Sequence, residues 1–134
     1  MSAGGARRAG PGPWGRRAEE AACRFLECQG YRVLARNFRC ARGEIDVVAE
    51  AGERGRSVIA FVEVKARRGT GFGSPEEAVG PGKRLRLLRA AHDYLERHCH
   101  GAGPATGPGL RFDLISVEVE PGKRCRITHL TGAF

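Results

Sequence analysis

Two short apolar segments of this chain each carry an acidic residue where a buried strand is expected. The first segment is Gly43-Glu44-Ile45-Asp46, and the second is Phe61-Val62-Glu63-Val64-Lys65. An unpaired carboxylate in an apolar interior is strongly unfavourable, because it loses its hydration without gaining a partner. The pattern therefore indicates a site at which positive charge faces both acidic residues.

Strand geometry predicts how these residues are arranged. Side chains alternate across a strand, so Glu63 and Lys65 share a face and lie roughly 6–7 Å apart along the strand. By the same rule Glu44 and Asp46 are expected on one face with Val48. If the two strands pair antiparallel across the short turn between them, Asp46 comes close to Glu63. Two like charges there repel each other unless a cation lies between them.

Magnesium suits such a pair of carboxylates, with Mn²⁺ as a substitute, because Mg²⁺ prefers oxygen ligands and binds through one or two carboxylates plus phosphate and water. A bound metal activates water and stabilises charge on a scissile phosphodiester. Lys65 is then expected to orient the water or to stabilise the developing negative charge. The simpler alternative is a Glu63–Lys65 ion pair at a sheet edge, with an arginine satisfying Asp46. The presence of all three residues in neighbouring strands favours the metal site.

The composition points to a nucleic-acid partner. The chain has 23 Lys and Arg against 15 Asp and Glu, a net charge of +8 and a pI near 9.9. A strongly basic small domain favours polyanionic ligands. Arginine greatly outnumbers lysine, so a generally arginine-rich proteome is the alternative explanation of the charge.

Length and composition also bound the organisation of the chain. The 134 residues, 41% of them hydrophobic, are enough for one globular domain, expected over residues 14–134. The Gly, Ala, Arg and Pro residues of segment 1–13 predict a disordered basic tail. The five cysteines form no C-x-x-C pair and no secretory signal is recognisable, which predicts reduced thiols in the cytoplasm. No apolar run approaches the roughly 20 residues of a membrane span, so no membrane partner is expected.

Hydrophobic periodicity predicts an α/β domain with a central mixed β-sheet flanked by helices, in the order α-β-β-β-α-β-β. Strand Ser57–Ala66 is apolar on both faces, which is typical of a central strand. Gly30 is expected just after the first helix. The expected helices are 14–29 and 83–98, and the expected strands are 31–38, 43–50, 57–66, 110–120 and 124–130.

Three local details accompany these elements. The chain is expected to turn over residues 37–42 and again over residues 51–56. The sequence Ser74-Pro75-Glu76-Glu77 is typical of a helix start, with Ser74 as the N-cap. In the second long helix the apolar face is expected to contain Leu85, Leu88, His92, Leu95 and Cys99.

The combined motifs resemble the YraN-like family of uncharacterised bacterial proteins. They are G-E-I-D at 43–46, F-V-E-V-K at 61–65, F-G-S-P-E-E-A-V at 72–79, K-R at 83–84 and R-F-D at 111–113. The resemblance runs from about Trp14 to Val119. It implies a restriction-endonuclease-like fold, similar to that of archaeal Holliday junction resolvases. It also implies that Asp46 binds metal, that Glu63 and Lys65 form the E-x-K pair, and that Glu19 of the first helix is an extra metal ligand.

Three further acidic residues have competing interpretations. Glu19 lies next to the apolar stripe of its helix, so it either leans over the site or stays solvated. Glu44 is expected to support the site or to pair with Arg42. For Asp113 an ion pair with a basic residue is favoured over a supporting role beside the metal ligands.

Several basic residues follow the site closely and are expected to contact the phosphates that flank a scissile bond. For any single arginine, a solvated surface position is the alternative. The candidates are Arg67, Arg68, Lys83, Arg84 and Arg86.

The leading hypothesis is a Mg²⁺-dependent endonuclease that acts on DNA, with branched or junction DNA as one candidate substrate and with RNA left open. A homodimer would place two such sites on a junction. Two alternatives remain. One is a nucleic-acid-binding module that keeps the nuclease fold without cleavage, and the other is a basic scaffold for DNA-processing proteins.

Overall fold

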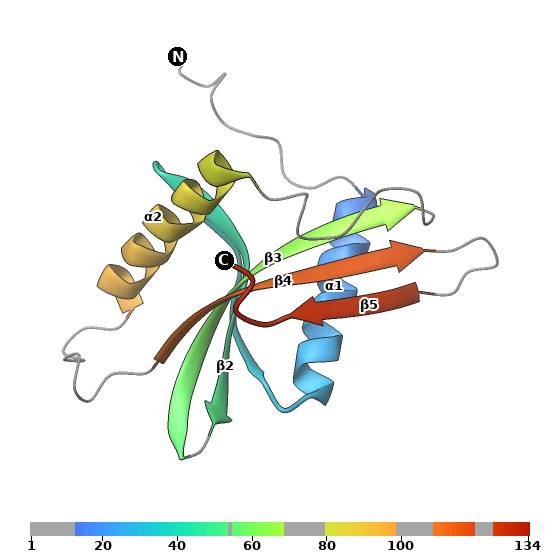
Figure 1. Ribbon diagram of the computed structural model, residues 1–134, viewed down its shortest axis with the longest axis horizontal. Helices are drawn as coiled ribbons and strands as arrows, with labels where there is room; N and C mark the ends of the chain where they lie inside the picture. The colour runs from blue at the N-terminus through green and yellow to red at the C-terminus, as the bar shows by residue number, and fades with distance from the viewer. Residues whose placement is uncertain (1–12, 54, 69–79, 99–108, 120–124) are drawn as a thin grey trace.

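Five strands and two helices form the described part of the chain (Figure 1). The computed structural model describes residues 13–53, 55–68, 80–98, 109–119 and 125–134. The order α-β-β-β-α-β-β is the expected one, and the α/β class is confirmed. The elements are α1 (Pro13–Cys28), β1 (Arg32–Cys40), β2 (Gly43–Glu53), β3 (Arg56–Arg68), α2 (Pro81–His98), β4 (Gly109–Val119) and β5 (Cys125–Leu130).

The strands form one mixed sheet in the order β1-β2-β3-β4-β5. Neighbouring strands are antiparallel except β3 and β4, which are parallel. The parallel pair follows from the connection through α2, since a parallel neighbour requires a crossover and not a tight turn. In this register Phe61 pairs with Phe112, and Lys65 pairs with Ser116.

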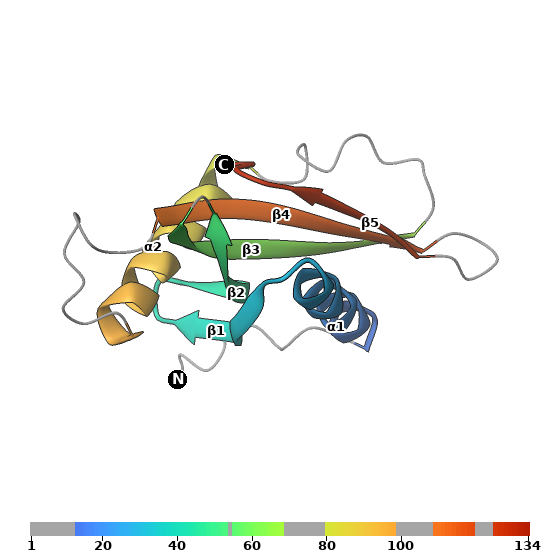
Figure 2. The same cartoon turned by 90° about the horizontal axis from the view of Figure 1, so that it is seen from below.

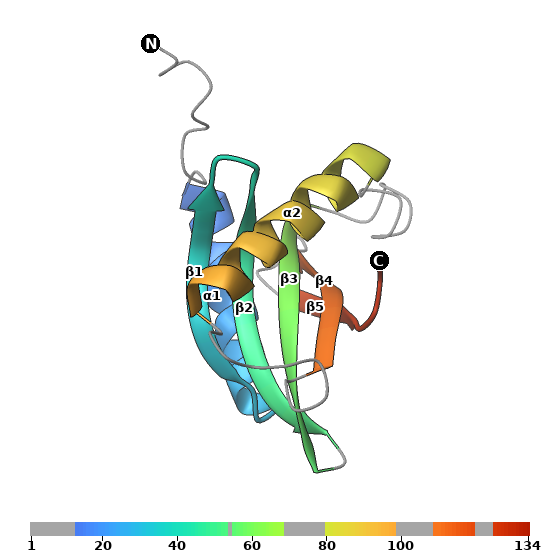
Figure 3. The same ribbon diagram turned by 90° about the vertical axis from the view of Figure 1, so that its left-hand side faces the viewer.

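The two helices cover opposite faces of the sheet. Figure 3 shows α2 in front of the sheet and α1 behind it, and Figure 2 shows the helices toward opposite ends. Ala60 and Val62 of β3 pack in the core on the α1 side, whereas Ile59 and Phe61 pack on the α2 side. The expectation that this strand is buried on both faces is confirmed.

Helix α1 forms and ends as its sequence predicts. The buried stripe contains Ala18, Ala22 and Leu26. Gly30 adopts a positive φ of 94°, a conformation that glycine reaches without a Cβ penalty. The Tyr31 N–H then donates to the Leu26 carbonyl at 2.9 Å and the Gly30 N–H donates to the Glu27 carbonyl at 3.0 Å. These two bonds form a Schellman motif that satisfies the last carbonyls of the helix.

Helix α2 buries a different face from the expected one. Leu85 and Leu88 are 46% and 51% exposed. A second stripe at helical spacing packs against the sheet instead, and it consists of Leu87, Ala90, Ala91 and Tyr94. Two small alanines allow the helix to approach the sheet closely, and the Tyr94 ring packs edge-on against Phe38 and Phe61. Cys99 lies outside the described residues.

Strand and helix boundaries also differ from the expected ones. β1 continues to Cys40, so the turn occupies only Ala41 and Arg42. The hairpin between β2 and β3 is likewise shorter than expected, because pairing continues to Glu53↔Arg56. α2 begins at Pro81, a position that suits proline because the first helical N–H has no partner within the helix. The helix start expected at Ser74 lies outside the described residues, as do residues 1–12.

Candidate functional site

The site forms where β2 separates from β3. Paired residues of the two strands end at Val47↔Val62. Ile45 and Val48 both pack on the α2 side, whereas Val47 and Ala49 pack on the α1 side. Simple alternation therefore fails between Ile45 and Val47, and the expected shared face of Asp46 and Val48 does not follow.

Beyond the last paired residues of β2 and β3, the Asp46 side chain accepts a hydrogen bond from the β3 backbone. The Val64 N–H donates to Asp46 Oδ2 at 2.7 Å. Burial and then the charge of Glu63 raise the pKa of the Asp46 carboxyl to about 7, although the Val64 N–H opposes the shift. The structure thus brings Asp46 under the electrostatic influence of Glu63, as the strand pairing predicted.

Two lysines share the Glu63 carboxylate, which is 7% exposed. Lys83 of α2 places Nζ 2.7 Å from Glu63 Oε1, and Lys65 of β3 places Nζ 3.9 Å from the same oxygen. Burial and the neighbouring Lys83 lower the pKa of Lys65. For Lys83 burial is the largest single effect and acts in the same sense, but the contacts with Glu63 and Lys65 and the charges of Glu63 and Asp46 together outweigh it, so the pKa of Lys83 is raised.

Glu19 leans inward from α1. It is 7% exposed, and the Asn37 side-chain amide donates to Glu19 Oε1 at 2.8 Å. Asn37 holds a positive φ of 50°, which asparagine tolerates better than most residues. Burial raises the pKa of Glu19 against the Asn37 bond, and the Glu19 charge in turn helps to raise the pKa of Asp46. The solvated position belongs instead to Glu20, which pairs with Arg24 at 2.9 Å.

The chemistry of this donor set fits Mg²⁺. Glu63 is a buried carboxylate and Asp46 is a half-buried one, and their mutual repulsion is relieved by a cation. Mg²⁺ commonly uses only one or two protein carboxylates and completes its shell with water and phosphate. No three His, Cys, Asp or Glu side chains in the described ranges form a group that could enclose a metal ion. A metal here would therefore depend on water and substrate oxygens for most of its ligands.

The candidate phosphate-binding residues occupy different environments. Lys83 contacts Glu63 directly, whereas Arg84 is exposed and stacks over the Phe134 ring at 5.8 Å. Arg86 is exposed near the site, and Arg67 is half-buried near the end of β3. The Arg68 side chain lies outside the described part of the structure.

A pocket of about 810 Å³ adjoins the carboxylates, between the turn that joins β1 to β2 and the first turns of α2. We call it the turn–helix pocket. Arg39 and Arg42, which the sequence reasoning missed, line it together with Arg86. Glu44 also lines the pocket, and its Oε2 lies 3.7 Å from Arg39 Nε. The remaining lining residues are Cys40, Ala41, Gly43, Glu63, Lys83 and Leu87.

Gly43 explains how the turn approaches the helix so closely. A Cβ added at Gly43 would collide with the backbone carbonyl oxygen of Arg86 and would lie 3.1 Å from its carbon. Any other residue would therefore push β2 away from α2. The glycine of the G-E-I-D motif thus has a packing role beside the acidic site.

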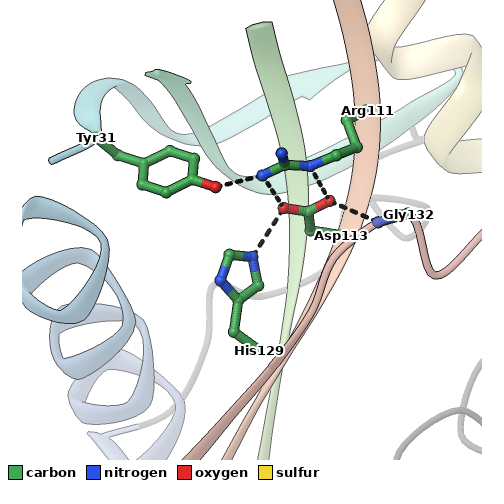
Figure 4. Close-up of polar contacts among 5 residues, drawn as sticks. All are labelled: Tyr31, Arg111, Asp113, His129 and Gly132. Carbon is green, nitrogen blue, oxygen red and sulfur yellow. Dashed lines mark hydrogen bonds and ion pairs between the residues drawn. The ribbon is translucent and has the colours of Figure 1, made fainter. Parts of the chain in front are cut away.

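Asp113 belongs to a separate network on the α1 face of the sheet (Figure 4). Arg111 donates to both Asp113 oxygens at 2.8 Å and also donates to the Tyr31 hydroxyl. His129 Nε2 lies 2.8 Å from Asp113 Oδ2, and the Gly132 N–H donates to Oδ1 at 3.0 Å. The structure shows the favoured ion pair with a basic residue, and these contacts do not place Asp113 beside the metal-binding candidates.

The comparisons with known proteins agree with this arrangement of motifs. The model of the uncharacterised protein family UPF0102 matches residues 18–117. The chain belongs to this family. The matched range contains Glu19, Asp46, Glu63, Lys65 and Lys83, and the membership confirms the YraN-like resemblance.

Relatives in this family match over most of their length. A UPF0102 protein of Pelobacter propionicus is 46% identical over 122 residues, covering 90% of this chain and 81% of the relative. One of Symbiobacterium thermophilum is 45% identical and covers 90% and 94% of the two chains. One of Myxococcus xanthus is 43% identical over 131 residues and covers 96% of each. Their names state no activity. In the described part of the chain, neither helix is long and apolar enough to cross a membrane.

Proposed function

We propose that the protein is a divalent-metal-dependent endonuclease that hydrolyses phosphodiester bonds in DNA. The observation that carries this proposal is the juxtaposition of Asp46 and Glu63 at the separation of β2 and β3. The Glu63 charge contributes to raising the pKa of Asp46 to about 7. A structure keeps two such carboxylates together at a cost in stability, and a metal site is one reason for that cost.

The side chains have distinct roles in this proposal. Asp46 and Glu63 would hold Mg²⁺ or Mn²⁺, and Glu19 would add negative charge near Asp46 from α1. When bound, the ion supplies an activated water and positive charge at the scissile phosphate. Lys65, whose Nζ lies 3.9 Å from Glu63 Oε1, donates a hydrogen bond to the negative charge that develops on the phosphate.

The proposed substrate is DNA, and the test includes one RNA substrate for comparison. The net charge of +8 and the exposed arginines of α2 support attraction to a phosphate backbone. Junction DNA would require two copies of the site, so a homodimer is part of the proposal for that substrate. Light scattering of the purified protein with and without four-way DNA tests it.

The test compares the wild type with Asp46→Asn, Glu63→Gln and Lys65→Met on linear, flapped and four-way DNA in Mg²⁺ or Mn²⁺, with one RNA substrate. We expect each substitution to reduce the cleavage rate by about 100-fold or more. Glu96→Gln is the matched control, because Glu96 is an exposed acidic residue of α2. Cleavage that survives Asp46→Asn or Glu63→Gln would show that the site assignment is wrong.

A nucleic-acid-binding module without cleavage is the second candidate. The Lys83–Glu63 contact of 2.7 Å favours it, because this ion pair neutralises Glu63 without a metal. The candidate replaces the nuclease if no substrate is cut while DNA is bound with a steep salt dependence. Absence of DNA binding at physiological salt would favour a scaffold for DNA-processing proteins.

A further inference from the structure

The lining of the turn–helix pocket indicates which form of DNA reaches the candidate metal-binding residues. Glu63 is part of its lining, so the pocket opens directly onto the candidate metal-binding residues. We propose that this pocket binds the phosphodiester backbone of a single, unpaired DNA strand. The inference rests on the proposed nuclease function and assigns to it a substrate with an unpaired segment, such as a flap.

The pocket is held open by the fold before any ligand arrives. On one side the Gly43 backbone abuts the Arg86 backbone, so β2 and α2 are in direct contact. On the other side Arg42 Nη2 donates to Asp93 Oδ1 at 2.9 Å, and it lies 3.3 Å from His92 Nδ1. Together these contacts tie the turn to two successive parts of α2. A preformed cavity binds its ligand without the cost of ordering its walls.

The charges of the lining select a phosphate chain. Among the described lining residues, four cations, from Arg39, Arg42, Lys83 and Arg86, accompany two carboxylates. Guanidinium groups match phosphate oxygens with two parallel N–H bonds, and Arg86 is exposed within reach of solvent. The cations come from both the turn and the helix, so they approach a bound strand from two sides.

The placement of the cations favours one strand over a duplex. Arg39 and Arg42 line the pocket from one side and Lys83 and Arg86 line it from α2, so they can contact a single backbone from two sides. The apolar parts of the lining, from Cys40, Ala41 and Leu87, contact the sugars of an unpaired strand. A pocket of about 810 Å³ lies within the usual range for ligand sites of about 300–1,000 Å³.

Among the described residues, no aromatic side chain lines the pocket. Base stacking on aromatic rings is the common source of base contacts in single-strand-binding proteins and is worth about 1–3 kcal/mol per base. Affinity in this pocket therefore depends on phosphate contacts and not on the bases. An abasic strand is expected to bind as tightly as a strand with bases.

The test measures binding without metal by fluorescence anisotropy, in a buffer that contains EDTA. The probes are a short labelled oligo-dT strand, an abasic strand of equal length, the corresponding RNA strand and a blunt duplex. We expect Arg86→Gln and Arg39→Gln each to weaken oligo-dT binding by about 5- to 10-fold. Each substitution should also reduce the slope of log affinity against log salt by about 0.7. Arg89→Gln, which removes an exposed charge of α2 outside the pocket, should change neither quantity appreciably.

Several outcomes would overturn the inference. Unchanged oligo-dT binding in both arginine variants would exclude the pocket as the binding site. Duplex binding as tight as single-strand binding and equally sensitive to Arg86→Gln would exclude the preference for an unpaired strand. Much weaker binding of the abasic strand would show that bases are contacted, and tighter binding of RNA would change the assigned source of the strand. Because no metal is present, loss of binding in the variants supports the pocket even if the cleavage assay finds no nuclease.

Discussion

Lys83 Nζ lies 2.7 Å from Glu63 Oε1, and this contact ties the first turn of α2 to the β3 carboxylate that is the best candidate for a metal ligand. The ammonium group lies against the same carboxylate that would hold a divalent cation. Lys83 also lowers the pKa of Asp46 against the stronger effects that raise it. The lysine therefore supplies part of the positive charge that the two carboxylates require.

Replacing Lys83 should strengthen metal binding. We expect Lys83→Gln to raise the affinity for Mn²⁺ about tenfold in isothermal titration calorimetry, equivalent to about 1.4 kcal/mol, because Glu63 no longer has a competing cation. Arg89→Gln, on the same helix but outside the pocket lining, should leave the affinity unchanged. An unchanged or lower affinity in Lys83→Gln would show that Lys83 does not compete with the metal.

The stability of the protein should depend on pH through Asp46. Its pKa is about 7 in the folded chain against 3.8 ordinarily, so the folded state holds the proton more tightly than the unfolded state. This contribution to the free energy of unfolding is complete below about pH 4 and is lost as the pH rises toward about 7. Relative to Asp46→Asn, the wild type should lose on the order of 2–4 kcal/mol over this range.

Urea unfolding of the wild type and Asp46→Asn at a series of pH values measures this difference. The other titrating groups cancel in the comparison, since both proteins contain them. Saturating Mg²⁺ should reduce the difference at neutral pH, because a cation favours the ionised carboxylate. Parallel stability curves without metal would contradict the raised pKa of Asp46.

Substituting Gly43 should destabilise the fold. In Gly43→Ala the new methyl group meets the Arg86 carbonyl, so β2 and α2 must separate. We expect a loss of about 1–3 kcal/mol in the free energy of unfolding, with weaker oligo-dT binding by the folded protein. The matched control is Gly52→Ala in the same strand, where the nearest atom to the added Cβ is 3.9 Å away. Equal effects of the two substitutions would argue against the close approach.

Removing Asp113 should affect stability and not metal binding. Asp113 is fully buried and bonds to Arg111, His129 and the Gly132 N–H. Asp113→Ala breaks the buried ion pair with Arg111 and removes the acceptor of the Gly132 N–H, a loss expected to cost about 3–5 kcal/mol. Mn²⁺ affinity of the remaining folded protein should match that of the wild type.

The exposed ion pair of Glu20 and Arg24 provides the comparison for Asp113. Glu20→Ala should change the free energy of unfolding by less than about 1 kcal/mol, because exposed pairs contribute little. Thermal unfolding followed by circular dichroism measures both variants. Reduced Mn²⁺ affinity in folded Asp113→Ala would contradict this prediction. It would show that the Asp113 network influences the candidate metal site, which the observed contacts do not indicate.

Local sequence carried enough information to predict much of this protein. The period-two pattern of β3 predicts a strand buried on both faces, and Gly30 predicts the end of α1, because both depend on backbone geometry over a few residues. The same pattern places Glu63 and Lys65 on one face. Local sequence is therefore enough to indicate the E-x-K pair and Asp46 as candidate site residues.

Helix α2 shows where local sequence failed. Its sequence contains two apolar stripes, one with Leu85 and Leu88 and the other with Leu87, Ala90, Ala91 and Tyr94. Hydrophobicity alone favours the leucine stripe. The sheet selects the other, because alanines permit close approach and Tyr94 fits against the rings of Phe38 and Phe61.

The amino-acid sequence by itself determined the order of elements and the family, and it indicated Asp46, Glu63 and Lys65 as the candidate site residues. Only the tertiary structure decided that Asp46 accepts a hydrogen bond from the Val64 N–H and that Lys83 pairs with Glu63. It also decided that Arg39 of β1 and Arg42 of the turn share a pocket with the start of α2. These relationships join residues far apart in the chain. They depend on where β2 separates from β3 and on how closely α2 packs, which no local pattern encodes.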